Sequence, residues 1–214
     1  MASVAIIDYG MGNLHSIAKA VQHADPAVDV WVTDDPDAIL RADRVVFPGV
    51  GGIRDCMAAL NARRLPPVLR EAALTRPVLG ICLGMQALLD ASEENDGTAG
   101  LGLIPGQVIR FPEGLSDASG QALKIPHMGW NRVNPVADHP VWDGIEPGSW
   151  FYFVHSYFAQ PSARSDVAAT TDYPAPFASA LTHGNLFAVQ FHPEKSQAAG
   201  LRLLSNFLRW TPAG

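Results

Sequence analysis

Several features are scarce in this chain, and each scarcity excludes a class of protein. Two cysteines in 214 residues are too few for the disulfide framework of a small secreted domain. No apolar run approaches the roughly 20 residues that a transmembrane helix needs. Basic residues number 15 against 21 acidic ones and form no run, which argues against a surface that follows nucleic-acid phosphates.

The amino-terminal stretch also lacks the basic segment and long apolar core of a secretory signal. We therefore expect a cytoplasmic protein with no membrane segment, in a reducing compartment where a thiol stays free. With 48% apolar residues the chain can bury one sizeable core, so residues 1–214 are expected to form a single domain. Small anionic molecules remain open as ligands.

Strand and helix signals alternate in the first half, and strand signals dominate the second. The pattern predicts an α/β fold, a single doubly wound domain with a central, mostly parallel sheet, helices on both faces and antiparallel strands in the second half. The expected strands are 4–8, 28–32, 45–47, 78–81, 107–111, 128–133, 150–156, 167–171, 178–181 and 186–191. The expected helices are 12–22, 53–61, 66–74, 83 to about 91, and 198–210, and a tight hairpin turn is expected at 183–185.

Cys82 lies where a buried-strand pattern meets a helical one, with Gly80 and Gly84 on either side. This arrangement is typical of a nucleophile elbow, in which a sharp turn presents a reactive side chain and only small residues fit the crowded backbone. A free cysteine is also often a small buried apolar residue. Cys56 has no flanking glycine, and we interpret it as such a packing residue.

A nucleophilic thiol needs a base, and His192 is the favoured candidate. The apolar run 186–191 ends there, and Pro193 prevents a further ladder hydrogen bond, so the imidazole should project from a strand end. Glu194 is close enough to orient the ring, as the third member of a catalytic triad does. A histidine that merely closes a strand is the alternative. His155 is a second candidate base, but its aromatic neighbours favour a structural role.

These residues carry a resemblance to a known family. The segment 80–86 together with 192–194 resembles the class I, or triad, glutamine amidotransferases, which release ammonia from the glutamine side chain. Four further segments resemble one branch of that family, the glutaminase subunits of imidazole glycerol phosphate synthase in histidine biosynthesis: 8–14, 48–51, 127–131 and 152–157. The similarity spans residues 4–207.

The resemblance implies a mechanism and a set of site residues. Cys82, His192 and Glu194 would be the catalytic triad of a reaction that passes through a cysteine thioester, with no cofactor and no metal. Hydrogen-bond donors to the oxyanion would come from the strand with Gly49, Val50 and Gly51 and from a backbone N–H of Leu83 or Met85. The residues implied to bind glutamine are Gln86, Ser156 and Tyr157. The glycines would allow a peptide flip in the 48–51 strand, although a tight strand-to-helix turn explains them equally well from spacing alone.

The resemblance also implies a partner. Ammonia released into water is protonated and lost as a nucleophile, so a second active site must receive it directly. In this family the receiver is a cyclase subunit with a (β/α)₈ barrel fold, in a heterodimer that makes imidazole glycerol phosphate and aminoimidazole carboxamide ribonucleotide. The positions implied to face it are Asn13, Met128, Gly129, Trp130, Asn131, Tyr152 and Lys195.

Two other readings stay open on the sequence. One is a glutaminase subunit of another ammonia-channelling synthase, such as pyridoxal phosphate synthase or anthranilate synthase, which would share the glutamine half-reaction. The segments 8–13 and 127–131 argue against it. The other is a non-catalytic binding protein on the same fold, but such proteins typically lack part of the triad, and all three triad residues are present here.

Overall fold

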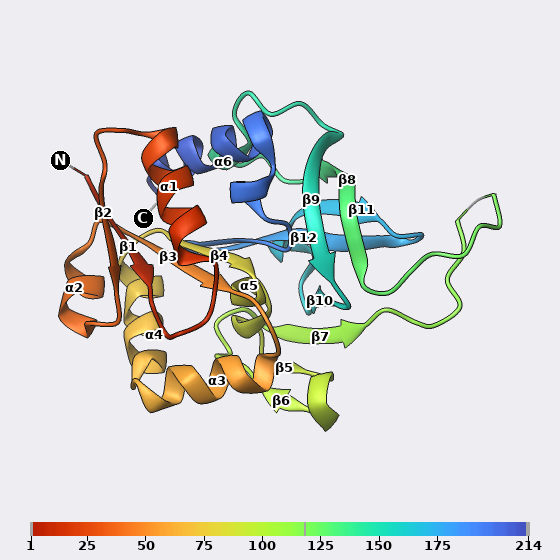
Figure 1. Ribbon diagram of the computed structural model, residues 1–214, viewed down its shortest axis with the longest axis horizontal. Coiled ribbons are helices and arrows are strands. Elements are labelled where there is room, and N and C mark those ends of the chain that lie inside the picture. Colours follow the sequence, from red (N-terminus) through yellow and green to blue (C-terminus); the bar gives the residue numbers. More distant parts are fainter. Residues whose placement is uncertain (1, 118, 213–214) are drawn as a thin grey trace.

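The computed structural model describes residues 2–117 and 119–212, and its centre is one large mixed sheet (Figure 1). Five neighbouring strands are parallel, in the order β2-β1-β3-β4-β13. Their bounds are β1 Ser3–Ile7, β2 Asp29–Thr33, β3 Arg44–Gly49, β4 Val78–Cys82 and β13 Leu186–Val189. Strands β1, β4 and β13 are buried along their whole length, which explains their continuous apolar runs.

Beyond β13 the sheet branches and is antiparallel except for the parallel pair of β5 and β7. β12 pairs with β13, β11 and β10; β10 continues through β7 to β5 and β6, while β11 leads to β8 and β9. The bounds are β5 Ala91–Ser92, β6 Thr98–Ala99, β7 Gly106–Arg110, β8 His127–Pro135, β9 Ser149–His155, β10 Tyr157–Pro161, β11 Val167–Asp172 and β12 Pro176–His183. Figure 1 shows β8 and β9 standing across the end of the sheet.

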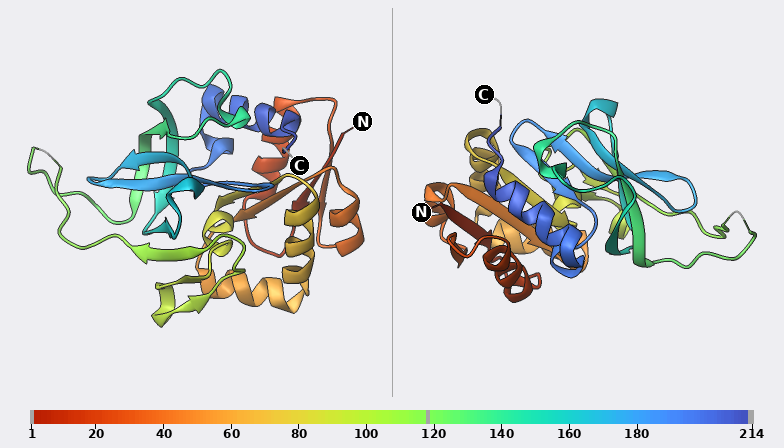
Figure 2. Two further views of the ribbon diagram at one scale, coloured as in Figure 1. Left: turned by 180° about the vertical axis from the view of Figure 1, so that it is seen from behind. Right: turned by 90° about the horizontal axis from the view of Figure 1, so that it is seen from above.

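Helices cover both faces of the parallel half (Figure 2). α1 (Leu14–Ala24) and α6 (Gln197–Arg209) pack together on one face. α2 (Pro36–Arg41), α3 (Ile53–Ala62), α4 (Leu65–Thr75) and the short α5 (Leu83–Ala87) cover the other. The 3₁₀ helices are η1 Glu94–Asp96, η2 Pro140–Trp142, η3 Arg164–Asp166 and η4 Pro193–Lys195. The expected doubly wound α/β fold is therefore confirmed.

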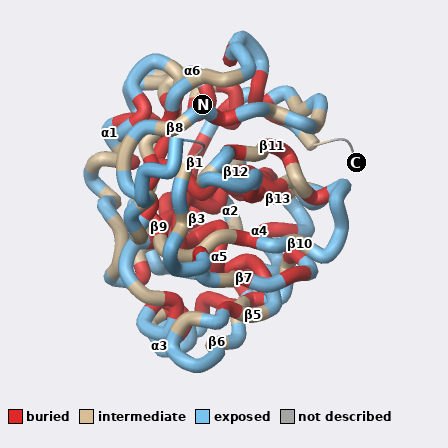
Figure 3. The backbone as a smooth tube through the Cα atoms, turned by 90° about the vertical axis from the view of Figure 1, so that its right-hand side faces the viewer, coloured by how far each residue is buried: buried red, intermediate tan, exposed pale blue. Residues whose placement is uncertain are grey.

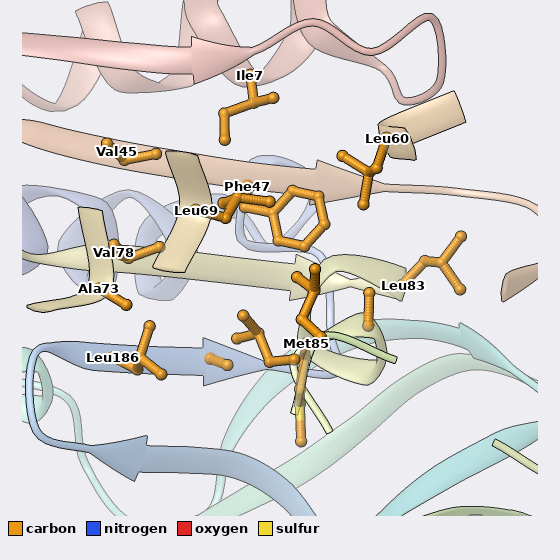
Figure 4. Packing of buried hydrophobic residues seen from close by; sticks show 14 of the residues in the cluster. Ile7, Val45, Phe47, Leu60, Leu69, Ala73, Val78, Leu83, Met85 and Leu186 are labelled. Atoms are coloured by element: carbon orange, nitrogen blue, oxygen red, sulfur yellow. The ribbon is translucent and has the colours of Figure 1, made fainter. Parts of the chain in front are cut away.

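Each face of the sheet has its own buried apolar cluster, visible as the red interior of Figure 3. On the α1/α6 face, Ile17 and Val21 meet Leu204 and Phe207, whose helical spacing forms one apolar stripe on each helix. On the opposite face, Phe47 lies at the centre of the cluster shown in Figure 4. The parallel strands are thus covered on both sides, and function is confined to their ends.

The elbow helix is shorter than expected. The prediction of a helix to about residue 91 is wrong, because α5 ends at Ala87. The carbonyl of Ala87 accepts the N–H of Leu101, and the carbonyl of Leu88 accepts the N–H groups of Leu103 and Ile104. These long-range bonds occupy the acceptors that a continuing helix would use, so the chain turns away.

Sequence periodicity also missed several short elements, among them the two-residue strands β5 and β6, the 3₁₀ helices, helix α2 and strand β10. Helix α2 is only 6 residues long, and too short to show a clear period. Strand β10 follows β9 after a bend at Ser156, where the chain leaves β8 and pairs with β7 instead. The predicted strand 150–156 therefore ends at His155, and the bend faces the edge where the parallel strands end.

Candidate active site

Cys82 occupies a strained elbow between β4 and α5. Its φ of 54° and ψ of −109° are unusual for a non-glycine residue and cost on the order of 1–3 kcal/mol. A Cβ on Gly84 would lie 2.0 Å from the carbonyl oxygen of Phe47, and one on Gly80 would lie 3.2 Å from the Cβ of Ala188. Close packing of the elbow against β3 therefore requires glycine at position 84, while position 80 has little room for a side chain beside β13.

Parallel strand pairing brings Cys82 and His192 to the same edge. In the β4–β13 ladder Ile81 is opposite Val189, so the residues that follow each strand emerge side by side. Cys82 and His192 both line one pocket of about 330 Å³. Two positions more than a hundred residues apart thus share one cavity.

His192 is buried and paired with Glu194. Its Nδ1 donates to Glu194 Oε1 over 2.9 Å, and the two side chains are 3% and 1% exposed. Burial alone would lower the pKa of the imidazole, but attraction to Cys82 and Glu194 outweighs burial and raises the pKa of His192 to about 9. The other ring nitrogen, Nε2, is buried without a hydrogen-bond partner among the described residues. The ring is therefore held by one nitrogen and free to exchange a proton at the other.

The pocket collects residues from several distant parts of the chain. Besides Cys82 and His192 it is lined by residues of the β3–α3 loop, of α5 and η1, of the segment before β8, of the end of β9 and of the β9–β10 bend. These are Val50, Gly51, Leu83, Gln86, Glu94, Pro126, Val154, His155, Ser156 and Tyr157. Of the expected oxyanion and glutamine residues, all but Gly49 and Met85 line it. Gly49 ends β3 opposite Cys82, and Met85 points into the core beside Phe47 (Figure 4).

Gln86 is fixed by two hydrogen bonds at the inner wall of the pocket. Its Nε2 donates to the carbonyl of Tyr157 and to Oε1 of Gln190, each over 3.0 Å. Because the Tyr157 carbonyl can only accept, this contact sets the orientation of the Gln86 amide. The side chain links α5 to the β9–β10 bend.

His155 lines the pocket but is engaged on both ring nitrogens. Nδ1 donates to the Tyr157 carbonyl over 2.8 Å, so Nε2 must accept from Nδ1 of His127, 2.9 Å away. Burial lowers the pKa of His155 to about 3. A neutral ring without a free nitrogen is poorly suited to take a proton from a thiol, so the geometry favours His192 as the base.

The structure adds two residues that the sequence analysis did not single out. Glu94 in η1 lines the pocket, and its Oε2 accepts the N–H of Ile53 at the start of α3 over 3.0 Å. Gln190 is fully buried after β13 and contacts both Gln86 and Cys82. The sequence signal for Gln190 is that it is the one polar residue in the apolar run 186–191. No local pattern marks Glu94, because its place depends on how η1 folds back toward α3.

The residues expected to face a partner lie in β8 and β9, just before α1 and at the end of η4. Met128 and Trp130 are 66% and 44% exposed, and Trp130 stands opposite Tyr152 in the β8–β9 ladder. Lys195 lies over the Tyr152 ring, 5.7 Å from its centre. Asn13 caps α1, Gly129 lies in β8, and Asn131 is tied to His127 and to the Asp172 carbonyl. Met128, Trp130 and Tyr152 therefore share one face of the β8–β9 pair, with Lys195 over the Tyr152 ring, whereas Gly129 and Asn131 alternate with them and are only partly exposed.

Two further properties concern the described residues alone. Within 2–117 and 119–212, none of the helices has the length and apolar character to cross a membrane. In the same ranges, no three or more His, Cys, Asp or Glu side chains are grouped so as to hold a metal ion.

Comparison with known proteins gives a consistent result. Residues 5–210 match the family model of class-I glutamine amidotransferases. Imidazole glycerol phosphate synthase subunit HisH of Methylococcus capsulatus is 70% identical over 99% of this chain and 98% of its own length. The subunit of the same name from Thiobacillus denitrificans is 56% identical over 98% and 92%.

Solved structures agree in fold. A glutamine amidotransferase crystal structure matches with a TM-score of 0.72 at 14% identity, covering 96% of this chain and 97% of that one. PurLQS from Thermotoga maritima matches with a TM-score of 0.71 at 17% identity, covering 97% and 98%. The chain belongs to the class-I glutamine amidotransferases and, within them, to the HisH subunits of imidazole glycerol phosphate synthase.

Proposed function

We propose that this chain hydrolyses glutamine to glutamate and ammonia at Cys82 and passes the ammonia to a cyclase subunit in histidine biosynthesis. The observation that carries the proposal is the pocket shared by Cys82 and His192, with Glu194 bonded to the far side of the imidazole. We further propose that residues 1–214 work as one amidotransferase domain in the cytoplasm, where a reducing environment keeps the thiol free.

The chemistry starts with proton transfer from Cys82 to His192. A histidine pKa near 9 makes the imidazolium the favoured form of His192 at neutral pH, and this cation can stabilise the thiolate as it forms. The thiolate attacks the carboxamide carbon of glutamine. The imidazolium then gives its proton to the leaving nitrogen, the C–N bond breaks, and ammonia departs from a thioester. Water activated by the neutral imidazole hydrolyses the thioester to glutamate and restores the thiol.

The tetrahedral intermediate carries a negative oxygen that needs hydrogen-bond donors. The backbone N–H of Leu83 is suited to this role, because the first residue of a helix has no intrahelical acceptor for its N–H. A second donor is proposed from Val50 or Gly51, which line the opposite wall. Gly49 and Gly51 would permit the peptide between them to reorient.

We propose that the pocket recognises glutamine through one carboxylate and several neutral polar groups. Glu94 lines the pocket and suits the ammonium group of glutamine, since a buried cation needs an opposite charge. Gln86 and the backbone of Ser156 and Tyr157 supply neutral hydrogen-bonding groups for the carboxylate and carboxamide.

The proposed partner is a (β/α)₈ barrel cyclase that binds the exposed face of β8 and β9 in a heterodimer. Two observations support this surface. Its aromatic residues, Trp130 and Tyr152, are types that dominate binding energy in protein interfaces. The carbonyl of Tyr152 also accepts the N–H of His192 over 2.9 Å, so the surface is one residue away from the proposed base.

A matched cysteine pair tests the function. We expect Cys82→Ser to lower glutamate release by at least about 10³-fold, in line with loss of a triad nucleophile. Cys56→Ser should retain activity, because Cys56 is buried in α3 and does not line the pocket. The assay is glutamate release with and without a purified barrel cyclase and its nucleotide substrate, together with labelling by 6-diazo-5-oxo-norleucine.

Glutamate release that survives Cys82→Ser would contradict the catalytic assignment. Failure of the electrophile to label Cys82, even with the cyclase present, would favour a binding protein. Stimulation by a different synthase subunit, and not by the cyclase, would reassign the acceptor of the ammonia.

A further inference from the structure

Gln190 is a buried amide in contact with the proposed nucleophile. It follows strand β13, is fully buried, and its backbone N–H donates to the Ser179 carbonyl over 2.9 Å. Its side-chain Nε2 lies 3.7 Å from Sγ of Cys82, within the range of an N–H···S hydrogen bond. A buried amide at this position is not needed for the apolar packing around β13.

The hydrogen-bond network determines which end of the Gln190 amide faces the sulfur. Gln86 Nε2 is a donor, because it contacts the Tyr157 carbonyl. The Gln190 atom that Gln86 also contacts must therefore be the oxygen, Oε1. The Gln190 nitrogen is then directed at Cys82. Exchanging the two ends would oppose two donors and leave no hydrogen atom for the sulfur.

We propose that Gln190 is a further catalytic residue, whose amide N–H donates to the Cys82 sulfur and stabilises the thiolate over the thiol. The proposal rests on the proposed role of Cys82 as nucleophile. A thiol sulfur is a weak acceptor, whereas hydrogen bonds to an ionised acceptor are about twice as strong as neutral ones. In a buried site with a low dielectric constant this difference grows.

Other groups near the sulfur act on the same equilibrium, in both directions. The His192 imidazolium stabilises the thiolate, and Glu194 holds that imidazolium in place. The Val154 carbonyl, 4.0 Å from Sγ, accepts from the thiol form and opposes ionisation. The Glu94 carboxylate in the same pocket also opposes it. Gln190 differs from all of these because it is a neutral donor whose own state does not change with pH.

His155 and Tyr9 complete the set of titratable neighbours. His155 is neutral, and both of its ring nitrogens are engaged in hydrogen bonds, one with the Tyr157 carbonyl and one with His127. The Tyr9 hydroxyl donates to the Pro48 carbonyl over 2.9 Å, so its hydrogen is not available to the sulfur. Neither group replaces the donor that Gln190 provides.

Titration of the Cys82 thiol tests the proposal without any need for turnover. The rate of Cys82 alkylation by iodoacetamide is measured against pH, with mass mapping to separate Cys82 from Cys56. We expect Gln190→Met, which keeps the length but removes the donor, to raise the apparent thiol pKa by about one unit. Gln190→Glu should raise it further, because it adds a like charge.

Ser179→Ala is the matched control. It removes a buried hydroxyl from the neighbouring strand, one with no hydrogen-bond partner among the described residues, and leaves the Gln190 amide intact. Its alkylation profile should coincide with that of the unaltered chain. An unshifted profile in folded Gln190→Met or Gln190→Glu overturns the proposal, whatever either change does to thermal stability.

A second measurement uses the unaltered chain, so it does not depend on any variant folding. With ¹⁵N-glutamine labelling, the side-chain amide proton of Gln190 should move downfield as Cys82 ionises, with the same midpoint as alkylation. A resonance that stays in place through that midpoint overturns the proposal. Failure of the proposed function has a different signature, namely a chain that releases no glutamate although the Gln190 resonance follows the thiol.

Discussion

At the scale of single residues, the two cysteines show how one residue type can occupy two different environments. Cys56 is fully buried in helix α3 and donates to the Tyr9 hydroxyl over 3.5 Å, and burial raises the pKa of its thiol to about 11. Cys82 has the same chemistry but opens onto a pocket beside His192. The difference comes from backbone geometry and neighbours, and not from residue type.

The pH dependence of glutaminase activity follows from the state of His192. Its pKa is raised to about 9, so the imidazolium that we propose as the proton donor to the leaving nitrogen is present below that pH and lost above it. We expect kcat/KM to fall as pH rises through about 9. Glu194→Gln removes the carboxylate that stabilises the imidazolium, which should move this limb to lower pH and reduce kcat by about 10²- to 10⁴-fold.

The measurement is glutamate release across the neutral and alkaline range, with the cyclase present. Glu113→Gln serves as control, because Glu113 is an exposed residue paired with Arg110 far from the triad in the chain. A basic limb that stays in the same place in Glu194→Gln would contradict the orienting role of the carboxylate.

At the scale of elements, the triad loop is held in place by helix α6. Ser196 Oγ donates to the His192 carbonyl and accepts the N–H of Tyr152, so the start of α6 ties η4 to β9. The helix approaches η4 so closely at Gly200 that a Cβ there would lie 1.9 Å from the Pro193 carbonyl oxygen. The position of His192 therefore depends on an element that carries no catalytic residue.

Gly200→Ala tests this contact, because its expected effect on stability is opposite in sign to that of the same change in an ordinary helix. In an ordinary helix interior the change to alanine stabilises by about 1 kcal/mol. Here the clash with Pro193 should lower the free energy of unfolding by at least about 2 kcal/mol and reduce glutaminase activity. Urea unfolding and glutamate release measure the two effects.

Gly184→Ala is the comparison for the Gly200 variant. Gly184 lies in the β12–β13 turn with open space around it, and its φ of 57° should cost only about 1–2 kcal/mol. Activity per folded molecule should be unchanged. A Gly200 variant as stable and as active as the unaltered chain would show that α6 does not constrain η4.

At the scale of the whole molecule, catalysis and partnership occupy adjoining regions at the edge where the parallel strands end. The exposed face of β8 and β9 carries Met128, Trp130 and Trp150, which are 66%, 44% and 50% exposed. Arg132 covers part of the Trp150 ring, 5.1 Å from its centre. An exposed apolar and aromatic surface of this kind marks an interaction site in a folded protein.

Trp130→Ala measures the contribution of this surface to assembly. If the proposed cyclase binds here, loss of a central tryptophan should cost about 2 kcal/mol or more and raise Kd by roughly 30-fold. Titration calorimetry or light scattering with the purified cyclase gives the number. Leu74→Ala is the control, since Leu74 is 80% exposed at the end of α4. Equal effects of the two changes would rule out the β8–β9 face as the interface.

Much of the architecture was predictable because its signals are local. The buried strands β1, β4 and β13 have continuous apolar runs, and α1 and α6 have helical stripes, so their bounds agree with prediction to within a few residues. The helix after Cys82 was predicted too long, because its last carbonyls are taken by the distant segment around Leu101. A pattern in a short stretch of sequence does not show that a distant segment will compete for the same backbone carbonyls.

The sequence by itself determined the elbow at Cys82 and the His192–Glu194 pair, because flanking glycines, a strand-ending proline and a two-residue spacing act over a few bonds. Only the tertiary structure decided that these parts share one pocket, since that follows from the parallel register of β4 and β13. The same is true of Glu94 and Gln190, whose roles exist only through contacts made across 40 or more positions. Local steric constraints depend on neighbouring residues, whereas the convergence of distant segments in one pocket depends on long-range packing.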